Sequence, residues 1–217
     1  MQELYQAVLD GDAKAAAALT RQALDNHVDA LELINSAMVP AMDEVGRLFE
    51  AEEYFVPELL LSARAMKASM ELLRPLLAAS GTAPAGRVAI GTVKGDLHDI
   101  GKNLVAALLE GGGFEVFDLG ADVAPEKFVA AIQEKGVGIV CLSALLTVTM
   151  PSMRATIEAL KEAGVRHNVK VMIGGAPVTQ QFADEIGADA YGASASAAVL
   201  LARRFAAQRN ESPAHTA

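Results

Sequence analysis

From residue 87 onward, short apolar runs alternate with segments whose apolar residues recur at helical spacing. The runs are apolar throughout, which is typical of strands buried on both faces of a parallel sheet. We therefore predict a doubly wound, flavodoxin- or Rossmann-like α/β domain with five parallel strands, whose ligand crevice lies at the carboxyl ends of the strands. The predicted strands are 87–93, 114–119, 137–142, 169–173 and 190–191, and the predicted helices are 100–109, 125–134, 151–163, 179–186 and 196–207.

The first 78 residues have apolar side chains at helical spacing and few turn signals, which predicts a four-helix bundle. Three helices are expected at 3–9, 13–26 and 30–49, and Pro40 is expected to kink or restart the third. A composition of 52% hydrophobic but only 5% aromatic residues suits such close-packed helices. The fourth and longest helix is predicted from a stripe in steps of three and four residues: Val56, Leu59, Ala63, Met66, Met70, Leu73 and Leu77.

A stretch of small and polar residues interrupted by proline and glycine, 79–86, separates the two patterns. This composition predicts a flexible linker between a bundle domain, 1–78, and an α/β domain, 87–208. The polar residues 209–217 are predicted to form a disordered tail.

Charge and composition exclude several classes of function. The formal net charge of −9 disfavours nucleic-acid and membrane-surface binding, because both need clustered Lys and Arg. The single cysteine, Cys141, lies within an apolar run and is expected to be a buried hydrophobic residue. The N-terminus lacks the pattern of a signal peptide and no segment is apolar enough to span a membrane, so we expect a soluble cytoplasmic protein.

The loop after the first predicted strand, 91–103, does not match a nucleotide-binding motif. Five residues separate Gly95 from Gly101, whereas the phosphate loop of nucleotide triphosphatases has four between its first Gly and its Gly-Lys pair. Asn103 stands where that motif has a Ser or Thr, and the dinucleotide fingerprint G-x-G-x-x-G is absent. A nucleotide site at this loop is therefore disfavoured.

The same loop contains Asp96 two residues before His98 and five before Gly101. A carboxylate beside an imidazole suits a metal-ligating histidine whose second ring nitrogen is held by the carboxylate. A lone histidine is more often structural or solvated, and Asp96 could also cap the helix that follows. The remaining histidines have no Cys, Asp or Glu at ligand spacing, so any metal here must already be held by an organic macrocycle. These histidines are His27, His167 and His215.

The segment 96–101 resembles the Asp-x-His-x-x-Gly motif of cobalamin-binding domains. Two further segments, 142–149 and 173–177, lie where that family has its other signatures. The helical half, including 54–58, resembles the cap domain of corrinoid-dependent methyltransferases such as methionine synthase. The resemblance extends over nearly the whole chain and is more specific than any single motif within it.

This resemblance implies that the chain holds cobalamin or a related corrinoid, with the cofactor's own base displaced and His98 as the cobalt ligand. It also implies that Asp96 and Thr149 form a relay behind His98, and that Ser143 and Thr147 bind the buried base or phosphate. Phe55 is the candidate for the upper face of the cobalt, with core packing as its alternative. Small residues would make room for the nucleotide tail: Gly101, Gly174, Gly175, Gly192 and Ala193. The remaining implied contacts are Leu97, Asp99, Ile100, Leu145 and Ala176.

The same resemblance implies that the chain is a methyl carrier between a substrate-specific methyltransferase and a methyl-acceptor methyltransferase that acts on a folate or a thiol. It contains no evident substrate-activating residues, so we expect a non-catalytic subunit. Two alternatives are the small subunit of an adenosylcobalamin-dependent mutase, disfavoured by the cap, and a corrinoid sensor, disfavoured because no DNA-reading element is evident. The methyl donor stays open among methylamine, methanol, glycine betaine and aryl methyl ethers.

Overall fold

The structure, a computed structural model, describes residues 1–80 and 83–211 and divides into two compact units. The first comprises residues 1–84 with 107–114, and the second comprises 85–106 with 115 onward. In the predicted linker, residue 79 still belongs to the last helix of the first unit, and residues 81–82 lie outside the described part.

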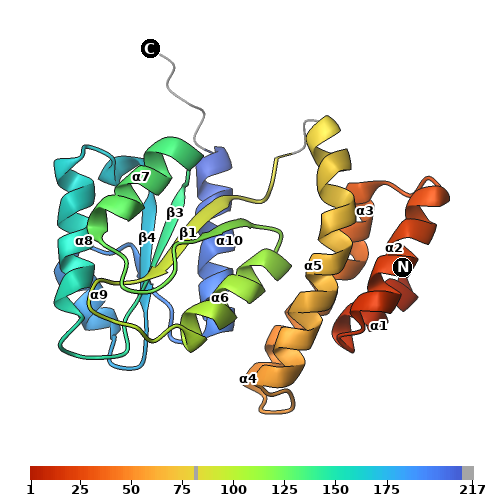
Figure 1. Ribbon diagram of the computed structural model, residues 1–217, viewed down its shortest axis with the longest axis horizontal. Helices are drawn as coiled ribbons and strands as arrows, with labels where there is room; N and C mark the ends of the chain where they lie inside the picture. Colours follow the sequence, from red (N-terminus) through yellow and green to blue (C-terminus); the bar gives the residue numbers. More distant parts are fainter. Residues whose placement is uncertain (81–82, 212–217) are drawn as a thin grey trace. The chain divides into compact units, whose positions relative to one another are not determined.

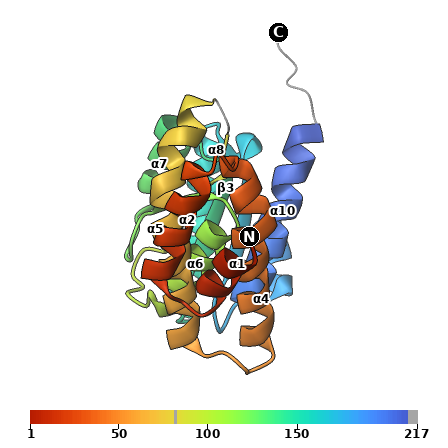
Figure 2. The same ribbon diagram turned by 90° about the vertical axis from the view of Figure 1, so that its right-hand side faces the viewer.

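The first unit is helical (Figures 1 and 2), as predicted. Asp12 and Asp29 accept hydrogen bonds from the first free amides of α2 and α3, which fixes where these helices begin. Helix α5 is the longest and contacts α1, α2, α3 and α4. The helices are α1 (Gln2–Leu9), α2 (Ala13–Asp25), α3 (Ala30–Leu33), the π-helical η1 (Ile34–Met38), α4 (Val39–Glu50) and α5 (Val56–Ala79).

Pro40 does not end the third predicted helix but follows a local widening of it. The chain stays helical from α3 to α4, but it widens into the π-helical turn η1 directly before the proline segment. The Val39 amide donates to the Ile34 carbonyl five residues back, and Pro40 follows as the second residue of α4. Because Pro40 has no amide proton and its ring clashes with the preceding turn, the wider turn accommodates it without ending the helix.

The predicted stripe on α5 is partly correct. Leu59, Met66 and Leu73 are buried as expected, whereas Val56 is exposed. Two hydroxyl residues, Ser62 and Ser69, are also buried on this helix although they are polar. Thr20 Oγ1 of α2 lies 2.9 Å from Ser69 Oγ and 2.8 Å from the Ala16 carbonyl, and Ser62 donates to the Leu9 carbonyl over 2.8 Å. These bonds satisfy the buried hydroxyls.

The second unit is the predicted parallel five-stranded sheet, in the order β2-β1-β3-β4-β5. Figure 1 shows α7, α8 and α9 on one face of the sheet and α6 and α10 on the other. The strands are β1 (Arg87–Thr92), β2 (Glu115–Asp118), β3 (Ile139–Ser143), β4 (Lys170–Gly174) and β5 (Ala190–Tyr191). The helices are α6 (Ile100–Gly111), of which residues 107–111 are counted in the first unit, α7 (Pro125–Lys135), α8 (Pro151–Glu162), the 3-10 turn η2 (Arg166–Asn168), α9 (Gln180–Ile186) and α10 (Ala195–Glu211).

The strand register brings the predicted site segments to one edge of the sheet. Thr92 at the end of β1 pairs with Ser143 of β3, which pairs with Gly174 of β4. The strand order reverses between β1 and β3, and ligands of doubly wound folds bind at such a point. A buried cluster that includes Phe128, Ile157 and residues of the inner strands fixes α7 and α8 on the sheet.

The predicted disordered tail, 209–217, is helical in its first part. Helix α10 continues to Glu211, so the first three residues of the predicted tail are helical, and 212–217 lie outside the described residues. Among the residues that the structure describes, no helix is both long enough and apolar enough to cross a membrane.

Candidate functional site

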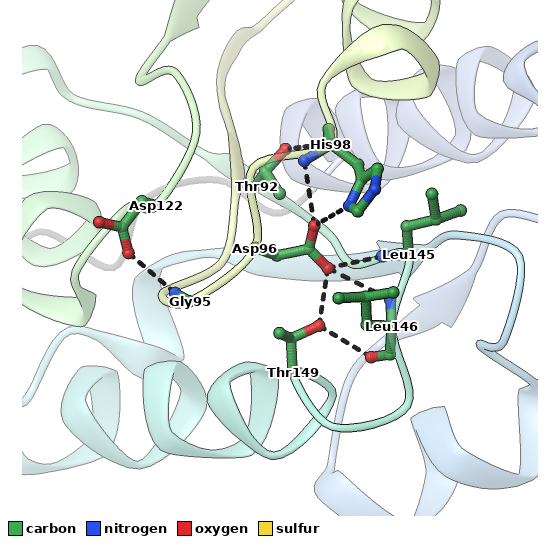
Figure 3. Close-up of polar contacts among 8 residues, drawn as sticks. All are labelled: Thr92, Gly95, Asp96, His98, Asp122, Leu145, Leu146 and Thr149. Atoms are coloured by element: carbon green, nitrogen blue, oxygen red, sulfur yellow. Dashed lines mark hydrogen bonds and ion pairs between the residues drawn. The ribbon is translucent and has the colours of Figure 1, made fainter.

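The loops that follow β1 and β3 meet at the switch point of the sheet, and a buried carboxylate connects them (Figure 3). Asp96 is fully buried. Its Oδ1 accepts the amide of His98 at 3.0 Å, and its Oδ2 accepts the amides of Leu145 at 2.8 Å and Leu146 at 3.2 Å. Thr149 Oγ1 lies 2.6 Å from the same Oδ2. Asp96 therefore fixes the His98 loop against the loop after β3.

These contacts keep Asp96 ionised. Burial by itself raises the pKa of a carboxyl group, but the hydrogen bonds from Thr149, His98 and Leu145 outweigh it and hold the pKa of Asp96 well below its usual range. The Thr149 hydroxyl also lies 2.8 Å from the Leu146 carbonyl, and its single proton can go to only one of these two acceptors. A carboxylate competes well for that proton.

His98 is oriented from two sides. Its Nδ1 lies 2.8 Å from Asp96 Oδ1, and its backbone carbonyl accepts a 2.9 Å hydrogen bond from the buried Thr92 hydroxyl of β1. Because a carboxylate only accepts hydrogen bonds, this contact places the ring proton on Nδ1 and the lone pair on Nε2. Half of the imidazole side chain is exposed. The arrangement presents Nε2 as a ligand atom.

Large apolar side chains are exposed on the two loops that carry this site. Leu97 is 75% exposed, Ile100 is 76% exposed and Val148 is 81% exposed, and Leu145 and Leu146 are exposed as well. Single exposed apolar residues are common, but a group on neighbouring loops indicates a surface that binds an apolar partner. A large apolar ligand beside His98 is consistent with this surface.

The glycines predicted to make room for a ligand fall into two groups. A Cβ on Gly175 would lie 1.9 Å from the Ala144 carbonyl oxygen, and a Cβ on Gly174 would lie 3.1 Å from the Gly192 carbonyl oxygen. The fold itself therefore requires Gly175, whereas a side chain at Gly174 would only make a tight contact. A Cβ on Gly101 would meet no atom within 4 Å, so packing within the protein does not explain why a glycine stands there.

The other predicted residues lie on the same edge of the sheet, with one exception. Phe55 belongs to the first unit, where it precedes α5, is 62% exposed and donates its amide to Glu58. Thr92, Leu146 and Asp122, which were not predicted from the sequence as site residues, also take part in the hydrogen bonds of this region. The remaining predicted residues lie in or beside the loops after β1, β3, β4 and β5: Asp99, Ser143, Thr147, Ala176, Gly192 and Ala193.

The buried carboxylate gives a testable expectation for stability. Asp96→Asn replaces one acceptor oxygen by an NH₂ group that faces at least two donors in either orientation. We expect the free energy of unfolding to fall by about 2–3 kcal/mol, the cost of unsatisfied buried polar groups. Urea unfolding of the cofactor-free protein measures this, with the exposed Asp184→Asn on α9 as the matched control. A loss as small as that of the control would contradict the role of Asp96 in joining the loops.

The difference in unfolding free energy between wild type and Asp96→Asn is expected to depend on pH. The pKa of Asp96 is lower in the folded chain than in the unfolded chain, where an aspartate has a pKa of about 3.9. Its contribution to stability is therefore fully present above a pH of about 5 and is lost as the pH falls through the folded-state value. We expect the stability difference between wild type and Asp96→Asn to shrink progressively below a pH of about 4. A difference that stays constant in acid would contradict this expectation.

Comparison with known proteins agrees with the geometry. The family described as B12 binding domain matches residues 86–200, and a second family with the same description matches residues 1–74. A corrinoid protein of Desulfitobacterium hafniense is 42% identical over 208 residues, which cover 94% of this chain and 96% of the relative. Dimethylamine corrinoid protein 1 of Methanosarcina acetivorans is 44% identical, with 95% of this chain and 97% of the relative covered.

Two solved structures share the fold over nearly the whole chain. The methanol:cobalamin methyltransferase complex MtaBC from Methanosarcina barkeri matches with a TM-score of 0.84 at 30% identity, covering 98% of this chain and 84% of that chain. A cobalamin-binding protein from Desulfitobacterium hafniense matches with a TM-score of 0.75 at 36% identity, covering 93% and 96%. Since family matches and relatives agree over both units, the chain belongs to the family of corrinoid proteins with B12 binding domains.

Proposed function

We propose that this chain carries methyl groups on a corrinoid whose cobalt is bound by Nε2 of His98, and that it exchanges them with two partner methyltransferases. The observation that carries the proposal is the half-exposed His98 imidazole held by the buried Asp96 carboxylate. When bound, the corrinoid supplies a cobalt centre that accepts a methyl group and gives it up again.

The donor set fits a metal that is already held by a macrocycle. Within residues 1–80 and 83–211, no group of three His, Cys, Asp or Glu side chains is placed to hold a metal ion. A bare zinc or iron ion needs at least three protein ligands, whereas a metal already held by a macrocycle would need only one from the protein, which His98 would supply. His98 alone is therefore sufficient.

The surroundings of His98 also fit a corrinoid. The exposed Leu97, Ile100 and Val148 offer apolar contacts to a flat ring, and the space beside Gly101 is open for the cofactor's nucleotide arm. Displacement of the cofactor's own base by His98 is part of this proposal. It is supported by the lone pair on Nε2 and by the absence of side-chain bulk at Gly101.

The chain's own residues keep the imidazole ready for ligation. Asp96 accepts the Nδ1 proton, which fixes the tautomer and makes Nε2 a better electron donor. Thr149 and the two amides of Leu145 and Leu146 hold the carboxylate in turn, so it does not rotate away from the ring. The ligand is thus preorganised before the cofactor arrives.

The relatives suggest the partners. They include dimethylamine and trimethylamine corrinoid proteins, and the structural match is to a methanol methyltransferase complex. We propose that one partner is a methyltransferase for a small methylated substrate, with a methylamine as the first candidate donor. The acceptor-side partner is proposed to transfer the methyl group to a folate or a thiol.

Methyl exchange tests the proposal. The chain is loaded with hydroxocobalamin, reduced, and incubated with isotopically labelled di- or trimethylamine and a cognate amine methyltransferase. We expect labelled methyl on the protein-bound corrinoid, detected after gel filtration, and its loss when a methylcobalamin-dependent thiol or folate methyltransferase is added. The matched control is the same mixture with His167→Ala, a histidine in η2 outside the site.

Two results would contradict the carrier function. Binding of adenosylcobalamin in preference to methylcobalamin, with no methyl exchange, would favour the mutase alternative. Binding of either corrinoid without exchange by any amine, methanol, glycine betaine or aryl-ether methyltransferase would favour the sensor alternative.

A further inference from the structure

The segment 95–102 carries Asp96 and His98. Two carboxylates of one short stretch, 118–122, which begins at the last residue of β2, hold the two ends of this segment. Asp118 holds the C-terminal end of the segment through Lys102, and Asp122 holds the N-terminal end through Gly95. In Figure 3, Asp122 of this stretch lies on one side of Asp96, and the loop after β3, whose amides hold the Asp96 carboxylate, lies on the other.

The C-terminal end is firmly fixed. The Lys102 side chain is almost fully buried, and its Nζ lies 2.5 Å from Asp118 Oδ2 and 2.6 Å from Asn103 Oδ1. Asp118 Oδ1 also accepts the Gly120 amide at 2.9 Å. A buried ammonium that lost its carboxylate would be costly, so this end of the segment does not move easily.

The N-terminal end depends on Asp122. Its Oδ1 accepts the Gly95 amide at 2.8 Å, and Lys94 Nζ lies 3.1 Å from the carboxylate. The Asp122 amide donates to the Asp96 carbonyl at 2.9 Å. The hydrogen bond from Gly95 and the contact with Lys94 lower the pKa of Asp122, so it stays ionised. Both side chains of the Lys94–Asp122 pair are partly exposed, so the pair by itself is weak.

The backbone at this contact is unusual. Asp122 has φ +52° and Gly95 has φ +87°, both in the left-handed region. Asp and Asn adopt this region more readily than other residues with side chains. The isolated parallel bridge between Val93 and Val123 fixes the two chains beside each other next to these residues. The turn thus brings a carboxylate onto the Gly95 amide, one residue before Asp96.

We infer that Asp122 is a positioning residue for the cobalt ligand, holding the turn at Gly95 so that the Asp96 carboxylate faces both His98 and the loop after β3. The inference rests on the proposed function of His98. It predicts that loss of the Asp122 carboxylate frees the N-terminal end of the segment while Lys102 still holds the other end.

Three substitutions separate the carboxylate from the backbone conformation. Asp122→Gly removes the acceptor without strain in the left-handed region, Asp122→Ala removes it with strain, and Asp122→Asn keeps an oxygen acceptor and the conformational preference. We expect the Gly95 amide of the cofactor-free protein to exchange its hydrogen about tenfold faster in both the Gly and the Ala variant. In the Asn variant the change is expected to stay within about threefold.

The second readout is spectroscopic. Each variant is loaded with hydroxocobalamin, and the ratio of imidazole-bound to imidazole-free cobalt is read from the absorbance spectrum. We expect this ratio to fall about tenfold in Asp122→Gly and Asp122→Ala and to be restored in Asp122→Asn. Asp184→Ala, which removes an exposed carboxylate on α9, is the matched control and is expected to leave both readouts unchanged.

Each other outcome has a distinct meaning. A wild-type protein without imidazole-bound cobalt would overturn the proposed function rather than this inference. Imidazole ligation that is present in wild type and unchanged in both the Gly and the Ala variant would overturn the inference. An effect in Asp122→Ala alone would assign the role to backbone strain and would also overturn it.

Discussion

Replacing Gly101 by leucine is expected to lower the affinity for a corrinoid by roughly 100-fold or more, because a side chain of this size would occupy the space proposed for the nucleotide arm. The fold is expected to tolerate the change. A Cβ at this position meets no atom within 4 Å, and Gly101 is the second residue of α6, where leucine has the better helix propensity. Loss of binding would therefore not be a consequence of unfolding.

Titration with hydroxocobalamin, followed by gel filtration and absorbance, measures this effect. Gly101→Ala gives a graded comparison, and Gln133→Leu on the exposed side of α7 is the matched control for an added apolar side chain. Urea unfolding of the cofactor-free variants tests whether the fold is retained. Wild-type affinity in Gly101→Leu would show that the arm does not pass this glycine.

The second large effect is expected for His98→Ala. Loss of a residue that hydrogen-bonds to a metal ligand typically lowers affinity or activity about 10–100-fold, so loss of the ligand itself is expected to lower corrinoid affinity by roughly 100-fold. The variant that still binds at high cofactor concentration is expected to lack the absorbance of imidazole-bound cobalt. His167→Ala in η2 provides the matched control, and an unchanged spectrum in His98→Ala would exclude His98 as the ligand.

The architecture could be predicted because its strands are apolar throughout and its connections carry helical patterns. Even the two-residue strand β5 was located from Ala190 and Tyr191, next to the turn signals around it. The π-helical turn before Pro40 could not be predicted, because proline is compatible with a kink, a restart or a widened turn. The buried Ser62 and Ser69 were also missed, since polar residues at core positions break the hydrophobic pattern.

Part of the candidate site could be predicted, and part depends on contacts between strands. The motif placed Asp96 beside His98, and the structure has Thr149 within hydrogen-bonding distance of Asp96; their role as a relay stays a prediction. The contributions of Thr92 and Asp122 were missed because both side chains bond to backbone groups, the His98 carbonyl and the Gly95 amide, and such contacts leave no pattern in one sequence. For Asp122, the available signal in the sequence was the pair of acidic residues, Asp118 and Asp122, on either side of the turn after β2.

The glycines show where resemblance and structure give different information. Gly101, Gly174 and Gly175 were all assigned to ligand space by resemblance. The structure separates them, because Gly175 has φ +133° and a Cβ there would collide with Ala144, whereas Gly101 stands in open space. Gly101 is therefore the position at which a binding role can be tested independently of folding.

The central claim, that His98 binds the cobalt in place of the cofactor's own base, is tested most directly by electron paramagnetic resonance. The protein is produced with nitrogen-15-labelled histidine, loaded with unlabelled cobalamin and reduced to the paramagnetic cobalt state, in which the axial nitrogen splits each cobalt line. We predict that labelling converts the splitting from a triplet to a doublet, and that His98→Ala removes the doublet. A triplet that persists with labelled histidine would show that the cofactor's own base remains on the cobalt, and would contradict the account.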